Sequence, residues 1–324
     1  MNSSTPLLFG PYGSGALPHI AEFHEAGANA LWFHGFHADA FDACARHAIA
    51  PCVEFKTFRA DFNERPELIP IGVDGKPIRY GRLVQGVCLS QKEFLAETEA
   101  NLLDGLRTFQ PVGIWLDYLT YAGWFETPDP DLQESCFCPA CMADFCEATG
   151  VDASTPTEIL TNHQPAWTRH KCERVARHAL HYANLIRTHL PNCMIGAYMC
   201  PWTPTEFAGA LTRIFAQDYA LFAPAIDVFT PLIYGTKSGR GATWGKEWLA
   251  AARGFVPPER KVQLILDALD FPDSLLATGK AQPASWGLQV FGGAQIFANP
   301  AWGEAFRRVV QQIHTQLDEN RKGS

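Results

Sequence analysis

The stretch VGIWLDYL, residues 112–119, is a short and almost wholly apolar run in which one acid, Asp117, stands near the end. Runs of this kind are typical of strands that are buried on both faces of a parallel sheet. The chain contains eight of them, at residues 6–12, 30–36, 50–56, 112–119, 193–199, 226–234, 261–269 and 292–298. Longer stretches with a helical spacing of apolar residues lie between them, and several end in or before Gly or Pro, as helices do. This alternation predicts a parallel sheet made of strand–helix units.

Eight strands, each followed by a helix, predict the α/β class and one (β/α)8 barrel, the TIM barrel, formed by residues 1–324 as a single domain. A doubly wound open sheet would show the same alternation, but the Gly-x-Gly-x-x-Gly turn of dinucleotide-binding sheets is missing after the first strand. The glycines of GPYGSG, residues 10–15, have another spacing and indicate an ordinary turn. The longest connection, residues 119–165, follows the fourth strand and is rich in cysteine, so we expect it to be an insertion into the barrel.

Composition and charge limit the partners of the protein. The net charge is −8 and no cluster of Lys and Arg is present, which argues against nucleic acid as a partner. The sequence lacks the features of a signal peptide, and no apolar run approaches the ~18 residues of a membrane span. We therefore expect a cytoplasmic protein without a membrane partner. The aromatic content of 12% favours a small-molecule carbohydrate substrate. No organic cofactor is expected, and homo-oligomerisation stays open.

Polar side chains are expected at the carboxyl ends of the predicted strands, where barrel enzymes carry their active sites. Carboxylates and aromatic residues at one rim indicate a carbohydrate site. There, one carboxylic acid protonates the leaving oxygen, and a second carboxylate attacks the anomeric carbon or activates water. The candidate catalytic residues are Asp117, Asp267 and Glu54. The candidate substrate-binding residues are His34, His37, Tyr118, Tyr234, Asp270, Trp202 and Trp302.

Asp117 is the main catalytic candidate, because an acid that ends an apolar strand is costly to bury unless it is used or paired. Apolar surroundings would raise its pKa, as a general acid requires; alternatively, Asp117 caps a helix or pairs with a basic residue. As its partner we favour Asp267 over Asp270, since side chains alternate along a strand and residues three apart cannot both point inward. Glu54 is the other candidate, although it could instead form a structural ion pair with Lys56.

Three polar residues have two interpretations each. Tyr234 could donate a hydrogen bond to the substrate or act as an aromatic plug. His34 and His37 are expected to bind sugar hydroxyls or to pack, because the His-x-His after the first strand that a metal-dependent hydrolase would need is missing.

Four cysteines crowd the predicted insertion: Cys136, Cys138 and Cys141 form C-x-C-x2-C, and Cys146 follows. Thiolates at this density suit a tetrahedral structural zinc site. Cys146 is five positions from Cys141 on a predicted helix and so lies off its face, whereas Cys88 could supply the fourth ligand from an earlier loop. Free thiols and a C-x-x-C redox pair are the alternatives. A catalytic zinc is disfavoured, because no His lies near the cluster in the sequence.

The segments VCLSQKEF, VGIWLDYLTY, CFCPACMADFCEATG, QDYALFAPAIDVFTPLIYG and GGAQIF, in this order, resemble a family of poorly characterised, glycoside-hydrolase-like (β/α)8 barrels. In that family, a motif D-G-I-x-L-D-Y-x-R-Y ends the fourth strand with the assumed catalytic Asp, and a motif D-x-x-x-P-M-x-Y ends the sixth with a site Tyr. The resemblance implies these roles for Asp117 and Tyr234, with Asp227 as the acid that opens the second motif. Thr120 and Leu232 stand where Arg and Met are common.

The segment CFCPACMADF is similar to the C-x-C-x2-C-x3-F of β-galactosidases that hold a structural zinc beside the active-site rim. This resemblance implies a zinc loop. Those enzymes carry Asn-Glu as acid/base on the fourth strand, where this chain has Leu116-Asp117. The departure argues against β-galactosidase activity and leaves the zinc loop in place.

Three functions are compatible with the sequence. The leading hypothesis is a glycoside hydrolase with Asp117 as general acid/base, assisted by Asp267 or by an acyl group of the substrate. A metal-dependent sugar isomerase or epimerase would instead use Glu54, Asp117, Asp267 and a His around a divalent ion. A non-catalytic carbohydrate-binding barrel would use the acids only to bind hydroxyls.

Overall fold

The computed structural model describes residues 7–78, 86–270 and 287–322. Its parallel strands form a closed barrel with eight positions, because β5 pairs with β6 and so joins the two ends of the sheet. The strands are β1 (Leu8–Tyr12), β2 (Ala30–His34), β3 (Ala50–Lys56), β4 (Gly113–Asp117), β5 (Met194–Met199), β6 (Val228–Ile233), β7 (Lys261–Val262), β8 (Leu264–Asp267) and β9 (Gly287–Phe291). β7 and β8 share one position, interrupted at Gln263. The predicted (β/α)8 barrel is confirmed.

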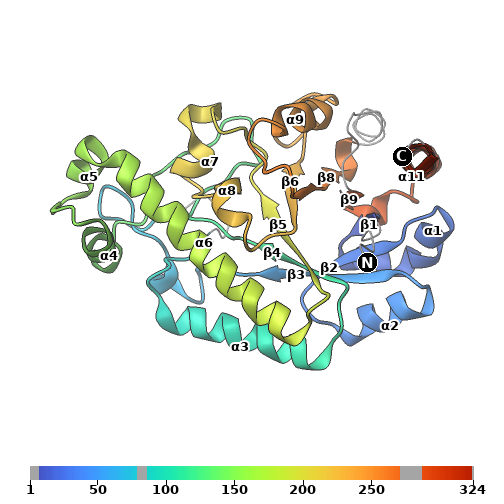
Figure 1. Cartoon of the computed structure of the whole chain (residues 1–324), viewed down its shortest axis with the longest axis horizontal. Coiled ribbons are helices and arrows are strands. Elements are labelled where there is room, and N and C mark those ends of the chain that lie inside the picture. Colours follow the sequence, from blue (N-terminus) through green and yellow to red (C-terminus); the bar gives the residue numbers. More distant parts are fainter. Residues whose placement is uncertain (1–6, 79–85, 271–286, 323–324) are drawn as a thin grey trace.

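Helices surround the barrel, and Figure 1 shows two long ones, α3 and α6, side by side along one flank. The α-helices are α1 (Ile20–Glu25), α2 (Ala38–Arg46), α3 (Lys92–Thr108), α4 (Pro139–Thr149), α5 (Pro156–Asn162), α6 (Gln164–His189), α7 (Ala210–Arg213), α8 (Tyr219–Phe222), α9 (Trp244–Ala252) and α11 (Pro300–Lys322). Short 3-10 helices span Ser14–His19, Pro66–Leu68, Glu206–Ala208, Ala268–Asp270 and Gly293–Gln295. In the described ranges, no helix combines the length and the apolar character that crossing a membrane requires.

The eighth strand lies earlier than predicted, at Gly287–Phe291 instead of 292–298. Gly292 follows it with φ 73°, a left-handed conformation that ends the strand, and a 3-10 turn begins at Gly293. A Cβ at position 293 would lie 2.5 Å from that of Pro11, so the chain passes very close to β1 here. Ile296 beyond the turn is fully buried. Its apolar character therefore reflects core packing and not a strand.

Two tryptophans fill the barrel interior just below the carboxyl ends of the strands. Trp32 of β2 and Trp115 of β4 are fully buried and meet edge to face, with ring centres 5.4 Å apart. Gly196 of β5 is the register partner of Trp115, and a Cβ there would come within 2.4 Å of the indole. The smallest residue on one strand thus makes room for the largest on the next, as the close packing of a barrel interior requires.

The connection between β4 and α6 holds α4 and α5 and is tied to the barrel by buried charges. Glu134 accepts hydrogen bonds from Lys171 Nζ at 2.9 Å and from Arg213 Nη1 at 2.8 Å. Lys171, which is completely buried on α6, also donates to the backbone carbonyl of Arg213. Every charge in this trio has a partner of opposite sign, which offsets the cost of burying it. The division of the chain into a barrel and an insertion over 119–165 stays a prediction.

Candidate active site

A cavity of about 280 Å³ opens at the carboxyl ends of the barrel strands. Four of the predicted site residues line it: Glu54, Asp117, Tyr118 and Tyr234. The other lining residues include Tyr12, Trp124, Phe125, Glu126, Tyr198 and Phe291. The cavity therefore combines carboxyl groups with a largely aromatic wall.

Glu54 and Asp117 lie on the neighbouring strands β3 and β4, and their carboxyl groups form a hydrogen bond with each other. Such a bond requires a proton on one of the two groups. Glu54 is 1% exposed, accepts a hydrogen bond from the Tyr12 hydroxyl, and lies 3.7 Å from Lys56 Nζ. Burial, followed by the negative charge of Asp117, raises the pKa of Glu54 well above its usual range. The proton of the pair therefore resides on Glu54.

Asp117 is held in place by the backbone around it. Its backbone carbonyl accepts hydrogen bonds from the Thr57 amide at 2.9 Å and hydroxyl at 2.6 Å, and its Oδ1 accepts one from the Tyr118 amide at 2.8 Å. Tyr118 has φ 57°, so the chain turns sharply directly after the acid. Non-glycine residues rarely adopt this conformation, and residues that do tend to cluster at functional sites. Burial raises the pKa of Asp117 above its usual range.

A second charged group flanks the cavity and is centred on Lys237. The Nζ atom of Lys237 lies 2.7 Å from Asp267 Oδ2 and 3.6 Å from Glu126 Oε2. The ammonium group also lies 4.5 Å from the ring centres of Tyr234 and Phe291, close enough for cation–π attraction. Burial raises the pKa of Glu126 to about 6, although Lys237 opposes the shift.

Glu126 takes the place at the cavity that was expected for Asp267. Among the described residues, Glu126 belongs to the lining and Asp267 does not. Asp267 is 4% exposed, and its carboxylate binds Lys237 and accepts a hydrogen bond from the Leu269 amide at 2.9 Å. Glu126 was missed because it lies in a loop. The one available signal is GWFET, residues 123–127, in which the acid follows two aromatic residues of the same wall.

Asp270 binds the backbone of a turn, and its expected role in substrate binding stays a prediction. Its two carboxylate oxygens accept hydrogen bonds from the backbone amides of Gly235 at 2.6 Å and Thr236 at 2.7 Å. These bonds fix the turn that follows β6. The turn carries Lys237, so Asp270 helps to position the charged group beside the cavity.

The two predicted tryptophans are not among the described lining residues of this cavity. Trp202 is 1% exposed and packs on Phe207 and Phe215, with ring centres 4.2 Å and 5.4 Å away. Trp302 belongs to α11 and packs against the hydrophobic core. Trp202 is thus packed in the core, and a contact of Trp302 with a sugar stays a prediction.

The two predicted histidines lie beside the cavity, on the connection from β2 to α2. His34 ends β2 and lines a second cavity that adjoins the first. His37 precedes α2, and its ring centre is 6.5 Å from that of His34.

The cysteine cluster is a separate site. The Sγ atoms of Cys88, Cys136, Cys138 and Cys141 all lie within 4.8 Å of one another. Cys88 Sγ is 3.7 Å from the Sγ atoms of both Cys138 and Cys141. In a tetrahedral zinc site with Zn–S bonds of about 2.3 Å, neighbouring sulfurs are about 3.8 Å apart. The four thiols can therefore hold a metal ion such as zinc.

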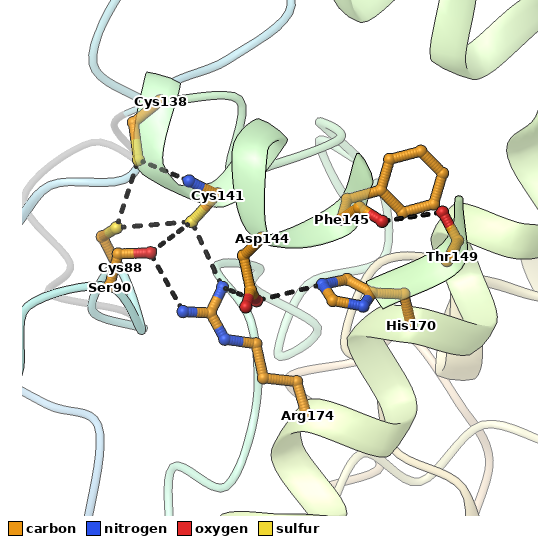
Figure 2. A network of polar contacts seen from close by, with 9 residues as sticks. All are labelled: Cys88, Ser90, Cys138, Cys141, Asp144, Phe145, Thr149, His170 and Arg174. Carbon is orange, nitrogen blue, oxygen red and sulfur yellow. Dashed lines mark hydrogen bonds and ion pairs between the residues drawn. The ribbon is translucent and has the colours of Figure 1, made fainter. Parts of the chain in front are cut away.

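Groups around the cluster are arranged to stabilise thiolates. Cys136 Sγ accepts a hydrogen bond from the Ile71 amide at 3.2 Å. Figure 2 shows Ser90 and Arg174 converging on Cys141, with Ser90 Oγ at 3.1 Å and Arg174 Nη1 at 3.4 Å from its sulfur. The same guanidinium reaches Asp144 at 3.5 Å. Hydrogen bonds from neighbouring thiols, chiefly that of Cys136, lower the pKa of Cys141 to about 6.

Cys146 does not join the cluster, which corrects the prediction that it could be a ligand. It lies further along α4 and donates a hydrogen bond to the carbonyl of Ala153 at 3.5 Å. Cys88 supplies the fourth sulfur instead, from the loop before α3. All ten cysteines lie in the described ranges, and none forms a disulfide.

Comparison with known proteins gives a fold but no sequence family. No protein-family profile matches the chain, and no curated protein matches it. Among solved structures, the chain is similar to the glycoside hydrolase domain of PgaB (BpsB) from Bordetella bronchiseptica, with 11% identity, 94% of this chain and 99% of that chain covered, and a TM-score of 0.73.

Two further similar structures have the same fold. A β-galactosidase from the haloarchaeon Halorubrum lacusprofundi is 12% identical, with 94% of this chain and 57% of that chain covered and a TM-score of 0.67. The catalytic domain of a β-amylase from Paenibacillus polymyxa is 10% identical, with coverage of 94% and 98% and a TM-score of 0.65. These structures are glycoside hydrolase barrels, and at such low identity the likeness shows the fold alone.

Proposed function

We propose that the protein hydrolyses a glycosidic bond of a carbohydrate, with Asp117 as the central acid/base residue. The observation that carries the proposal is the hydrogen-bonded pair of Glu54 and Asp117 in an aromatic-walled cavity at the carboxyl end of a barrel. The glycoside hydrolases among the structures of this fold give further support.

The carboxyl pair is suited to deliver a proton. Glu54 is buried, whereas Asp117 is half-buried and borders the cavity. Asp117 is therefore the group that meets the leaving oxygen: the proton held by Glu54 passes to Asp117 through their hydrogen bond, and Asp117 delivers it to that oxygen. The transfer leaves a second negative charge on the pair. Lys56, with Nζ 3.7 Å from Glu54, stabilises that charge.

Glu126 is the second carboxylate of the proposed reaction. With a pKa of about 6 it is mostly ionised at neutral pH, as a nucleophile or a base for water must be. Lys237 binds it on one side, and Asp267 holds Lys237 in turn. The three carboxyl groups then have divided roles: the Glu54–Asp117 pair keeps a proton and Glu126 has lost its own.

The aromatic wall supports a sugar as the substrate. Trp124 and Phe125 have nearly parallel rings with centres 6.2 Å apart, and Tyr12 stacks with Phe291 at 5.4 Å. Flat apolar faces of this kind suit the C–H faces of a pyranose, while the carboxyl groups and the Lys56 ammonium suit its hydroxyls.

One observation weighs against a metal-dependent isomerase. Within the described residues, one cluster of three or more His, Cys, Asp or Glu side chains is close enough to share a metal ion, and it consists of the four cysteines. Glu54, Asp117 and Asp267 do not form such a group with a His. The non-catalytic alternative differs in its outcome, because such a protein would bind sugars without hydrolysing any glycoside.

A screen of nitrophenyl glycosides tests the proposal. We expect hydrolysis of at least one glycoside, and a decrease of about 10²-fold to 10⁴-fold in kcat in the Asp117→Asn variant. Asp152→Asn, an exposed acid remote from the proposed chemistry, is the control and should keep full activity. Activity that persists in Asp117→Asn, or a protein that binds sugars and hydrolyses none, would reject the proposal.

The cysteine cluster is part of the same proposal as a structural zinc site. Its ligands would be Cys88, Cys136, Cys138 and Cys141, and a tetrahedral metal with four thiolates has no open position for substrate. The metal would join the loop before α3 to the start of α4. It would thus hold the far end of the connection that carries Glu126.

A further inference from the structure

A second cavity of about 520 Å³ adjoins the proposed active site. It opens between the connection from β2 to α2 and the helix α3, and it is lined by Phe36, Thr98 and Asn101 among others. Glu54 and Lys56 line both cavities. A molecule in the second cavity can therefore be continuous with one at the carboxyl pair.

Two cations face this second cavity, and neither has a full counter-charge. Arg59 is exposed, and its guanidinium lies 5.8 Å from the ring centre of Tyr118. Within the described residues, no carboxylate oxygen lies within 4.0 Å of the Arg59 guanidinium nitrogens. Lys56 lies 3.7 Å from Glu54, but Glu54 already shares the proton of its bond with Asp117.

The charges beside the cavity add up to an excess of positive charge. One proton in the Glu54–Asp117 bond leaves one negative charge on the pair, against the two positive charges of Lys56 and Arg59. The other acid of the lining, Asp104, is already paired with Arg107 at 2.9 Å. One of the two positive charges therefore has no negative partner among the described lining residues, and a bound anion would supply one.

The same positive charges act on His34, which lines this cavity. Its pKa is lowered to about 4, first by burial and then by the positive charges of Lys56, His37 and Arg59. The imidazole is therefore neutral at pH 7 and can both donate and accept hydrogen bonds. It adds a polar contact to the cavity without adding charge.

We propose that the second cavity is a subsite for a sugar that carries an anionic substituent, a carboxylate, sulfate or phosphate, next to the sugar whose bond is cleaved. The inference rests on the proposed glycosidase function and narrows its substrate class to acidic glycosides. Arg59 is the main contact, because a planar guanidinium binds two anionic oxygens at once. Lys56 contributes a second positive charge at the junction with the carboxyl pair. A neutral sugar would leave one of the two positive charges without a negative partner.

Calorimetric titration with paired methyl glycosides tests the subsite. The probes are neutral gluco, galacto and manno methyl glycosides, their uronic acid counterparts, and the corresponding 6-phosphates and 6-sulfates. We expect at least one acidic member to bind about tenfold or more tightly than its neutral counterpart, the effect of one charge-assisted hydrogen bond. The pairs also identify the anionic group, because carboxylate, phosphate and sulfate are compared on one sugar.

Three variants separate the subsite from a general effect of charge. Arg59→Gln should remove the preference for the acidic sugar and leave the affinity for the neutral one unchanged, whereas Arg59→Lys should keep part of it. Arg169→Gln, on the exposed surface of α6, is the matched control and should bind like the wild type. Equal binding of all acidic and neutral pairs, or equal loss of both in Arg59→Gln, would overturn the inference.

The outcomes also distinguish failure of the subsite from failure of the function. Hydrolysis of neutral glycosides as fast as acidic ones, with loss in Asp117→Asn, would keep the glycosidase and reject the subsite. Tight binding of an acidic sugar without hydrolysis of any glycoside would keep the subsite as an anion site and reject the glycosidase.

Discussion

Glu54 and Asp117 share one proton across the boundary between β3 and β4. The two acids come from strands whose residues pair in register, with Glu54 opposite Trp115 and Lys56 opposite Asp117. Their side chains point to the same face of the sheet, so the closed barrel forces the carboxyl groups together. A pair of acids kept this close retains a proton at a pH where an isolated acid would lose it.

The pH dependence of stability follows from the raised pKa of Glu54. Because this pKa is higher in the folded than in the unfolded state, its contribution to stability is fully present below about pH 4.3 and is lost as the pH rises through the folded value. We expect the wild type to lose stability from acid to neutral pH relative to Glu54→Gln, which does not titrate. Chemical denaturation of both proteins across this range measures the difference. Parallel pH profiles would mean that Glu54 is an ordinary, ionised acid.

The acid limb of the activity profile should belong to Glu126. Its pKa is raised to about 6, and the proposed role requires the ionised form, so kcat/KM should fall below about pH 6. Glu126→Gln should lose activity by about 10²-fold or more and should also lose this limb. The measurement is kcat/KM against pH for both proteins on the best aryl glycoside. A limb that stays in Glu126→Gln would assign the ionisation to another group.

Zinc content should follow the four clustered sulfurs. We expect about one zinc per chain in protein purified under reducing conditions, and loss of the metal in Cys138→Ser. Cys146→Ser is the matched control, because Cys146 lies outside the cluster and bonds to Ala153. Elemental analysis reads out the metal, and thermal unfolding with a chelator reads out its contribution to stability. Wild-type protein without zinc would leave the cysteines as packing thiols.

The buried charges around Glu134 should matter more than exposed ones. Glu134→Gln would leave Lys171 buried with no acid beside it, so we expect a loss of about 3 kcal/mol or more in the free energy of unfolding. Arg169→Gln breaks an exposed pair with Glu173 and should change stability by less than about 0.5 kcal/mol. Denaturant titration of both variants gives the comparison. Similar small losses would mean that the buried trio is no stronger than a surface ion pair.

The fold could be predicted from the sequence because the barrel strands are buried on both faces. Such strands form short apolar runs, and the alternation of runs with amphipathic stretches is specific for strand–helix units. The exception is the eighth strand, for which the apolar residues near Ile296 were mistaken for the strand itself. Two consecutive glycines, Gly292 and Gly293, in fact end the strand before that segment.

The site could be predicted only where it lies on strands. Glu54 and Asp117 point inward near the ends of their strands, which brings them to the cavity. Cys88 could be predicted as a fourth ligand because it is a cysteine in a loop near the other three. Glu126 and Lys237 lie in loops, whose path depends on contacts far away in the sequence. Trp202 was misjudged for the converse reason, because a strand end can also lead a side chain into the core.

The tryptophans of the barrel interior also limit the routes by which a substrate can reach the cavity. Trp32 and Trp115 lie one pleat below His34 and Asp117 and are fully buried, so in the described structure they seal the barrel axis beneath the cavity. Substrate must then enter, and product must leave, through the same mouth. For the proposed hydrolase, a polysaccharide could then reach the carboxyl groups only across the rim and not along the barrel axis.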